Sequence, residues 1–277
     1  MGYAFVLALS KMLFPKMPTG AYVHYPTIST DMLSSLEADG LGLNAGAGEG
    51  TKGLLKRKYW EAFALLYSFV GSTIDMVATN SSWTQNHIQQ LWGERRKAKG
   101  RAKAKIIYPP VAVKELEDEI EISLATEHAR EPAILYIAQF RPEKNHTLII
   151  KAFEQLIFEG NLESEDAKLV LVGSVRDKED ATRVYKLRLL ARELKLKDKV
   201  EFVCDATWPQ VLDRLQRSSI GVNGMWNEHF GIGVVEYQAA GLISVVHNSG
   251  GPKQDIVVDM DGSQTGKDSV CMTVLNR

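Results

Sequence analysis

The feature that most constrains the fold is a regular alternation, from Pro132 onward, of short β-branched runs with stretches whose apolar residues recur at helical spacing. The expected strands are ILYIA (134–138), KLVLVG (168–173), VEFV (200–203), SIGVN (219–223) and LISVVH (242–247). Two expected helices carry the apolar sets Leu148, Ile149, Ala152, Phe153, Leu156 and Ile157, and Val184, Leu187, Ala191 and Leu194, and a third begins near Trp208. Such alternation indicates βαβ units, in which helices cover both faces of a parallel sheet.

The first part of the chain shows a less regular version of the same pattern. AYVHYP (21–26) and IDMVATN (74–80) are expected to be strands, and SSWTQNHIQQLW (81–92) is expected to be a capped helix after the second one. A second parallel α/β unit is therefore predicted here.

A proline pair marks the division between the two parts. Pro109 and Pro110 exclude a helix and favour an extended crossing. The economical model is α/β, with two Rossmann-like lobes at 1–110 and 132–277 joined by a linker at 111–131.

Charge and cysteine content exclude several classes of protein. The 33 Lys and Arg residues nearly balance the 34 Asp and Glu residues, giving a net charge of -1, so no nucleic acid is expected as a partner. Cys204 and Cys271 lie far apart without Cys or His neighbours at ligand spacing. The sequence therefore predicts neither a disulfide framework nor a zinc site, and it indicates a reducing compartment.

Two apolar segments are candidates for a targeting or membrane segment. The N-terminal MGYAFVLALSKMLFP has no basic region before its apolar run, and Lys11 and Pro15 end that run, so a buried strand or helix is expected. YWEAFALLYSFVGSTIDMVA carries Glu61 and Asp75 and does not reach the roughly 18 uninterrupted apolar residues of a membrane span. This chain is therefore expected not to cross a bilayer.

GEGTKG (48–53) matches the G-x-G-x-x-G pattern of dinucleotide-binding loops. No strand precedes it and no acidic residue ends a second strand at the expected distance. A P-loop is also excluded, because Lys52 follows Thr51 rather than a glycine. A flexible surface loop is the expected structure.

The stretch NEHFGIGVVEYQAAG (227–241) places two glutamates around a glycine pair. Glu228 and Glu236 are eight residues apart, which corresponds to about 12 Å of helix rise, whereas the paired carboxylates of glycosidases lie roughly 5 to 9.5 Å apart. The pair therefore fits a ligand that is held at both ends better than it fits hydrolysis.

Phosphate is the expected middle part of that ligand. The expected helix start comprises Phe230, Gly231, Ile232 and Gly233. Free N–H groups and the positive end of the helix dipole make such a start an anion site, and Glu236 would then bind a hydroxyl pair such as that of a ribose. The alternative is that Glu228 favours the helix dipole and Glu236 lies on a solvated face.

Two further loops are expected at the same sheet edge. Arg141 and Lys144 follow the first strand of the second lobe in FRPEKN, and HNSGGPKQDIV (247–257) follows its last strand. Ligands of open α/β sheets bind at the carboxyl ends of the strands, and two cations can neutralise a diphosphate without a metal. Three polar loops at one edge indicate a binding site.

Five motifs together resemble the retaining GT-B glycosyltransferases. They are YVHYPTISTDML, VATNSSWTQNHI, YIAQFRPEKNH, NEHFGIGVVEYQAAG and HNSGGPKQDIV, and they occur in the order found in that family. More narrowly, the chain resembles the α-1,2-mannosyltransferases that use GDP-mannose and act on dolichol-linked oligosaccharides at the cytosolic face of the endoplasmic reticulum. The resemblance runs nearly from residue 1 to about Gly266.

This resemblance implies a transfer of mannose from GDP-mannose to a dolichol-diphosphate oligosaccharide with retention of the anomeric configuration. It implies an acceptor lobe at 1–110, a donor lobe for the GDP-sugar at 132–277, and no metal cofactor. The membrane surface and other glycosyltransferases of the pathway are the further partners that it implies.

The resemblance also assigns roles to individual residues. Glu228 and His24 resemble the residues near the transferred sugar, and Glu236 the one that holds the donor ribose. Arg141 and Lys144 look like the diphosphate cations, beside Phe230, Gly231 and Ile232 at the helix start. Without the resemblance, a histidine inside a β-branched strand such as His24 is usually a satisfied core residue.

The sequence departs from the family pattern at three places. Gln139 stands where the wider family has arginine, and His229 replaces the usual small residue or proline. The chain also begins well inside the first lobe of the family and ends in TGKDSVCMTVLNR. We therefore expect an incomplete first lobe, and the alternative to the enzyme is a non-catalytic donor-lobe product that binds a nucleotide sugar or a partner subunit.

A basic segment in the first lobe is a candidate for membrane contact. Lys52, Lys56, Arg57 and Lys58 precede aromatic residues at 59 and 60 and an apolar helix. Basic residues beside aromatic ones fit an anionic membrane surface, and a core helix with a solvated basic start is the alternative.

Overall fold

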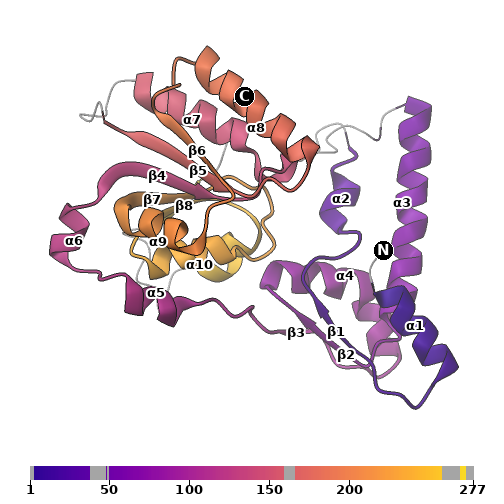
Figure 1. Cartoon of the computed structure of the whole chain (residues 1–277). Helices are drawn as coiled ribbons and strands as arrows, with labels where there is room; N and C mark the ends of the chain where they lie inside the picture. The colour runs from indigo at the N-terminus through magenta and orange to yellow at the C-terminus, as the bar shows by residue number, and fades with distance from the viewer. Residues whose placement is uncertain (1–2, 38–47, 49, 159–165, 258–268, 273–277) are drawn as a thin grey trace. The chain divides into compact units, whose positions relative to one another are not determined.

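The computed structural model consists of two compact units, each with a parallel sheet of its own (Figure 1). It describes residues 3–37, 48, 50–158, 166–257 and 269–272. The units are Met1–Pro109 and Pro110–Arg277. The division falls between the two prolines of the crossing.

The first unit has a three-stranded sheet in the order β1-β2-β3. The strands are β1 (Gly20–Val23), β2 (Met76–Thr79) and β3 (Lys105–Ile106), and the helices are α1 (Ala4–Leu13), α2 (Thr30–Ser34), α3 (Gly50–Gly71) and α4 (Ser82–Ala98). The predicted strand at 74–80 and the capped helix after it are confirmed, since Ser81 accepts a hydrogen bond from the backbone N–H of Thr84.

One expectation for this unit is confirmed in part, and another is wrong. The N-terminal apolar segment forms a helix, α1, as expected, and Phe5, Leu7 and Ala8 pack against the core, but only Ala4 is fully buried. The segment 48–53 is not a loop from Gly50 on, since α3 begins there. Glycine at position 53 permits the first turn of α3 to lie close to Gly48, because a Cβ on Gly53 would overlap the backbone of Gly48.

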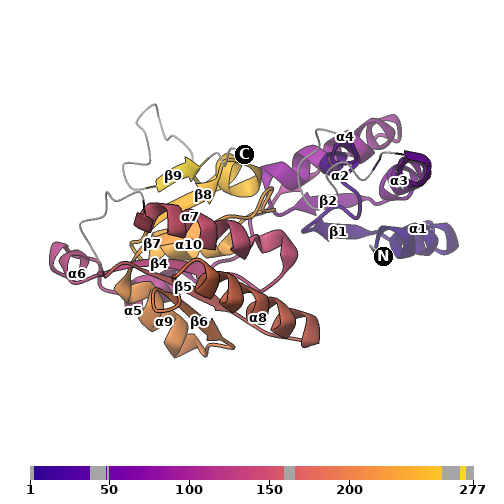
Figure 2. The ribbon, with the colours of Figure 1, turned by 90° about the horizontal axis from the view of Figure 1, so that it is seen from above.

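The second unit has a six-stranded parallel sheet in the order β6-β5-β4-β7-β8-β9, which can be followed in Figure 2. Its strands are β4 (Glu131–Ile137), β5 (Lys168–Gly173), β6 (Val200–Cys204), β7 (Ser218–Asn223), β8 (Ile243–His247) and β9 (Ser269–Met272). Its helices are α5 (Val113–Glu119), α6 (Leu124–His128), α7 (His146–Phe158), α8 (Lys178–Glu193), α9 (Trp208–Arg217) and α10 (Ile232–Ala239). Short helical turns at Pro142–Lys144 and Pro252–Ile256 complete it. The strands and helices predicted from Pro132 onward are confirmed.

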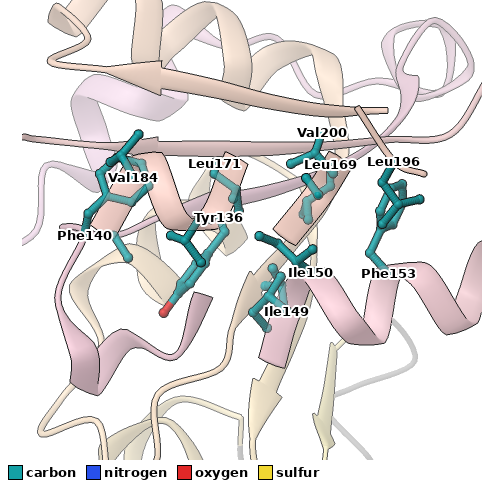
Figure 3. Close-up of a cluster of buried hydrophobic side chains, with 14 of the residues drawn as sticks. Tyr136, Phe140, Ile149, Ile150, Phe153, Leu169, Leu171, Val184, Leu196 and Val200 are labelled. Atoms are coloured by element: carbon teal, nitrogen blue, oxygen red, sulfur yellow. The ribbon is translucent and has the colours of Figure 1, made fainter. Parts of the chain in front are cut away.

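Helices cover both faces of this sheet, as predicted. Leu169 and Leu171 of β5 belong to the core under α7 and α8, which is drawn in Figure 3. Val170 and Val172 point to the opposite face, where they pack with residues of α5, α9 and α10. Adjacent residues of one strand are thus buried on opposite sides, which is typical of a parallel sheet between two layers of helices.

The segment 111–131, which the sequence analysis treats as a linker, is part of the second unit. It forms α5 and α6, and Leu116 and Ile120 are buried in the core with Leu135. The apolar positions in this acidic segment explain why it packs against the sheet rather than spanning open solvent.

Candidate functional site

Helix α10 begins at the glycine pair of the stretch 227–241, so the predicted helix start is confirmed. Gly231 has a φ of 103°, and a Cβ at this position would lie 3.0 Å from the Cγ of Pro252. Ile232 is the first helical residue, and no side chain caps the N-terminus. An uncapped N-terminus with glycine beside it has the geometry of an anion site.

The loop after β8 packs directly on the loop that carries Glu228. The backbone N–H of Gly251 donates to the carbonyl oxygen of Glu228 at 2.7 Å, and that of Asn227 donates to the Oγ of Ser249 at 2.8 Å. Gly250 has a φ of 68°, and a Cβ there would overlap the same carbonyl oxygen. The two glycines are therefore needed for this close approach, which fixes the backbone around Glu228.

The loop after β4 also reaches Glu228. Lys144 forms an ion pair with Glu228, in which the two side chains are only 22% and 13% exposed. The Lys144 backbone is held in turn, because the hydroxyl of Tyr136 donates to its carbonyl oxygen at 2.6 Å. The loops after three adjacent strands, β4, β7 and β8, thus converge on one glutamate.

The two glutamates of the stretch have opposite electrostatic environments. Burial by itself raises the pKa of the Glu228 carboxyl, but Lys144, His229 and Asn223 outweigh it, and this pKa lies below its ordinary value. Burial raises the pKa of the Glu236 carboxyl above its ordinary value. No described residue forms a hydrogen bond or ion pair with that carboxylate, and its Oε2 lies 4.0 Å from the place that a Cβ on Gly233, in the first turn of α10, would take. Glu228 is thus a compensated charge, whereas Glu236 is suited to accept hydrogen bonds from a ligand.

Arg141 lies in the same loop as Lys144 but takes no part in the pair with Glu228. Its guanidinium is 3.8 Å from the Glu143 carboxylate, and its Nε is buried without a hydrogen-bond partner among the described residues. The structure therefore brings Lys144 and Glu228 together, with Arg141 nearby on the chain and not in this contact.

Three supporting residues were missed by the sequence analysis. The buried hydroxyl of Tyr237 accepts a hydrogen bond from the backbone N–H of Ile137 at 2.8 Å. The Oδ1 of Asn223 accepts a hydrogen bond from the backbone N–H of Met225 at 3.0 Å, and its Nδ2 donates to the Oε2 of Glu228 at 3.4 Å. Ser249 is the third. Asn223 stands at the carboxyl end of a predicted strand, and Tyr237 and Ser249 lie in stretches already assigned to the site, but their individual contacts could not be predicted.

The remaining candidates behave differently. His24 lies in the first unit directly after β1, where it is exposed and contacts the ring of Tyr22 edge-on at 4.6 Å. It is therefore not a satisfied core histidine. Phe230 is buried and Ile232 is 44% exposed, so only the latter has a side chain that a ligand can readily contact.

The described residues contain no candidate metal site and no helix that could span a membrane. No group of three His, Cys, Asp or Glu side chains among them is placed to hold a metal ion. None of the described helices combines the length and the apolar composition needed to span a bilayer.

Known protein families match almost the whole of the chain. Residues 1–92 match the model described as "ALG11 mannosyltransferase N-terminus", and residues 117–264 match the model "Glycosyl transferases group 1". The chain belongs to the group 1 glycosyltransferases. The converging loops described above all lie within the residues of the second match.

Several relatives of this group 1 glycosyltransferase carry the name "GDP-Man:Man(3)GlcNAc(2)-PP-Dol alpha-1,2-mannosyltransferase". The one from Neurospora crassa is 60% identical over 278 residues, which cover 96% of this chain and 50% of the relative. The one from Homo sapiens is 44% identical over 271 residues, which cover 96% of this chain and 53% of the relative. The chain thus spans about half the length of these curated relatives.

Solved structures place this group 1 glycosyltransferase in the GT-B fold, as predicted. Anabaena Alr3699/HepE in complex with UDP and glucose aligns with a TM-score of 0.63 at 14% identity, covering 98% of this chain and 61% of that one. Sucrose-phosphate synthase from Thermosynechococcus elongatus aligns with a TM-score of 0.62 at 18% identity, covering 92% and 57%. At these identities the similarity concerns the fold alone.

Proposed function

We propose that this chain provides the GDP-mannose site of an α-1,2-mannosyltransferase that acts on a dolichol-diphosphate oligosaccharide in the N-glycan precursor pathway. The observation that carries the proposal is the convergence of three loops on Glu228, which pairs with Lys144. Among the described residues, Glu236 on the adjoining helix α10 has no hydrogen-bond or ion-pair partner. The shared name of the relatives supplies the donor, the acceptor and the linkage.

In this proposal the site residues divide the donor between them. Lys144 and Arg141 bind the diphosphate together with the N-terminus of α10. Glu236 accepts hydrogen bonds from the ribose hydroxyls, because its carboxylate is partly buried and unpaired among the described residues. Glu228 lies beyond the phosphates and accepts hydrogen bonds from hydroxyls of the mannose.

Charge compensation is the contribution that these side chains make to the reaction. Cleavage of the donor bond leaves additional negative charge on the GDP diphosphate, and fixed cations and helix N–H groups stabilise that charge most strongly in the transition state. The cations do this without a metal. The anomeric configuration is retained, and the reaction takes place at the cytosolic face of the endoplasmic reticulum membrane.

The proposal is tested by titrating the chain with GDP-mannose, GDP and UDP-glucose in a calorimeter. GDP-mannose and GDP should bind, and UDP-glucose should bind at least tenfold more weakly. A preference for UDP-glucose, or no binding of either guanine nucleotide, would overturn the donor assignment. A separate transfer assay supplies GDP-mannose labelled in the sugar and a dolichol-diphosphate oligosaccharide. Label that appears on the oligosaccharide and is released by an α-1,2-mannosidase would identify the acceptor and the linkage.

A further inference from the structure

The loop after β8 holds the backbone on both sides of Glu228. The N–H of Asn227 donates to the Oγ of Ser249, and the carbonyl oxygen of Glu228 accepts from the N–H of Gly251. Asn227 has a φ of 53°, in the left-handed region that residues with a Cβ seldom adopt. The bond to Ser249 therefore stabilises a conformation that Asn227 would adopt less readily by itself.

A histidine holds the Ser249 hydroxyl in turn. The Nδ1 of His247, the last residue of β8, lies 2.8 Å from the Oγ of Ser249. Burial lowers the pKa of His247, so its imidazole is neutral at neutral pH and its Nδ1 can accept a proton from a hydroxyl. Ser249 can thus donate to His247 while it accepts from Asn227, and a chain of hydrogen bonds links the end of β8 to the residue before Glu228.

The direction of the Glu228 carboxylate depends on this backbone. Its Oε1 accepts from the N–H of His229 at 3.3 Å, and its Oε2 pairs with Lys144 and accepts from the Nδ2 of Asn223. A rotation of the peptide between Asn227 and Glu228 would move the carboxylate relative to all three partners. Side chains of a binding site keep their direction when neighbouring hydrogen bonds fix their backbone.

We propose that Ser249 and His247 are positioning residues that orient Glu228 toward the sugar of the donor. The inference rests on the proposed function, in which Glu228 accepts hydrogen bonds from hydroxyls of the mannose. Without the bond from Asn227 to Ser249, Asn227 leaves the left-handed region more often and the carboxylate loses its direction. Binding of the mannose should then weaken, whereas the diphosphate and the ribose are bound by other residues.

Calorimetry with GDP-mannose and with GDP separates the two parts of the donor. The sugar ratio, defined as the affinity for GDP-mannose divided by the affinity for GDP, reports the contribution of the mannose. Ser249→Ala should lower the sugar ratio roughly fivefold, because a neutral hydrogen bond contributes about two- to tenfold to an equilibrium constant. It should not weaken the binding of GDP.

Two substitutions of His247 differ mainly in the hydrogen-bond acceptor that they offer to Ser249. His247→Asn can place its amide oxygen near the position of Nδ1, whereas His247→Leu has no acceptor. We expect the sugar ratio of the parent for His247→Asn and a lowered one for His247→Leu. Combining His247→Leu with Ser249→Ala should lower it no further than Ser249→Ala alone, because both changes act through one hydroxyl.

Glycine at position 227 tests the role of the backbone conformation. Glycine adopts the left-handed region without the steric cost of a Cβ. Ser249→Ala should therefore lower the sugar ratio less in the Asn227→Gly background than in the parent. Lys195→Gly is the matched control, since Lys195 has a φ of 57° in the turn after α8, and it should not reduce the effect of Ser249→Ala.

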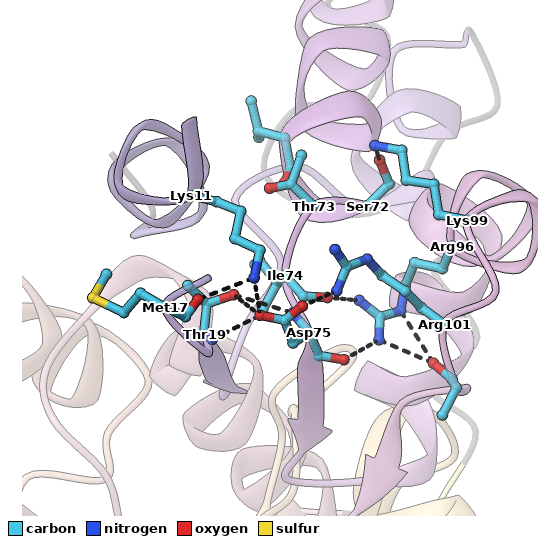
Figure 4. Close-up of polar contacts among 12 residues, drawn as sticks. Lys11, Met17, Thr19, Ser72, Thr73, Ile74, Asp75, Arg96, Lys99 and Arg101 are labelled. Atoms are coloured by element: carbon cyan, nitrogen blue, oxygen red, sulfur yellow. Dashed lines mark hydrogen bonds and ion pairs between the residues drawn. The ribbon is translucent and has the colours of Figure 1, made fainter. Parts of the chain in front are cut away.

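Thr19 of the first unit provides a matched control for the loss of a hydroxyl (Figure 4). Its Oγ1 accepts from the backbone N–H of Asp75 at 3.1 Å and donates to the Asp75 carboxylate at 3.0 Å. This hydroxyl thus joins a backbone N–H to a side-chain acceptor, as that of Ser249 does. Thr19→Val should lower the free energy of unfolding and leave the sugar ratio unchanged.

Two results would overturn the proposal. The first is an equal weakening of GDP-mannose and GDP by Ser249→Ala, which would mean that the hydroxyl supports the fold as a whole. The second is an unchanged sugar ratio in both Ser249→Ala and His247→Leu. If Ser249→Ala does not fold, equal sugar ratios of His247→Leu and His247→Asn would overturn it.

Unfolding of the free protein separates this inference from the proposed function. In denaturant titration, Glu228→Gln should cost less in the Ser249→Ala background than in the parent, because the ion pair with Lys144 is already weakened there. This coupling in a parent that binds neither GDP-mannose nor GDP would refute the proposed function and leave the positioning of Glu228. Donor binding with additive costs of unfolding would refute the positioning alone.

Discussion

Glu228→Gln removes the charged partner of Lys144 and should destabilise the free protein. The two side chains are 13% and 22% exposed, so the ion pair lies mostly out of water. Removing one partner of a fully buried pair costs about 3 to 5 kcal/mol, and the residual exposure of Lys144 lowers the expected cost to about 2 kcal/mol. Denaturant titration of parent and variant measures this difference in the free energy of unfolding.

The same substitution should strengthen GDP binding. In the parent, Lys144 has to be shared between Glu228 and the diphosphate, whereas in the variant the diphosphate is its only anionic partner. We expect a gain of roughly tenfold in affinity, which corresponds to about 1.4 kcal/mol. Calorimetry with GDP measures it, and Lys144→Met combined with Glu228→Gln is the control that should abolish the gain. An equal or weaker affinity of Glu228→Gln would show that Lys144 does not meet the diphosphate.

The pH dependence of stability provides a second measurement on this pair. The pKa of Glu228 is lower in the fold than its ordinary value of 4.5. Its contribution to stability is therefore complete above pH 4.5 and is lost as the pH falls through the lower folded value. The parent should lose this contribution in acid, and Glu228→Gln should lack that part of the pH dependence.

Three further predictions concern the same loops. Arg141→Ala and Lys144→Ala should each weaken the binding of GDP more than that of guanosine in calorimetry, and equal losses would mean that the two cations support the fold instead. Gly250→Ala should lower the free energy of unfolding by about 1 to 3 kcal/mol. Gly20→Ala, where a Cβ has open space, should not lower it. Equal denaturation curves for the two variants would contradict the close approach of Gly250 to the backbone of Glu228. The raised pKa of Glu236 should fall when ribose hydroxyls donate hydrogen bonds to its carboxylate, so GDP binding just above pH 4.5 should release protons. Calorimetry in two buffers of different ionisation enthalpy measures this release. Proton uptake, or no proton exchange, would contradict the prediction.

Much of the second unit could be predicted from the sequence because its strands are short, apolar and separated by helical spacing. The carboxyl ends of parallel strands lie at one edge of the sheet, so the polar loops that follow these strands could be assigned to that edge. The pairing of Lys144 with Glu228 could not be predicted, because it joins loops 84 positions apart and depends on their backbone paths. Gly250 and Ser249, which fix one of these paths, lie in a loop that could be assigned to this edge, but their contacts with the loop that carries Glu228 could not be predicted.

The first unit was harder to predict because local patterns there have two structural solutions. The apolar composition of residues 4–13 predicts a buried helix. How much of that helix is exposed depends on what covers the side that faces away from the core. GEGTKG reads as a loop because glycine disfavours helices, but Gly53 is required for close contact with Gly48. In both cases tertiary packing, which the sequence does not show directly, decided the outcome.

The affinity of Glu236→Ala for GDP tests the central claim most directly, because this carboxylate is partly buried and has no hydrogen-bond or ion-pair partner among the described residues that its loss would disturb. A hydrogen bond to a charged group contributes about 1.5 to 3 kcal/mol, so calorimetry should show GDP bound roughly ten- to a hundredfold more weakly than by the parent. Glu193→Gln, an exposed glutamate at the end of α8, should bind like the parent. An unchanged dissociation constant for Glu236→Ala would contradict the account and remove this residue from the donor site.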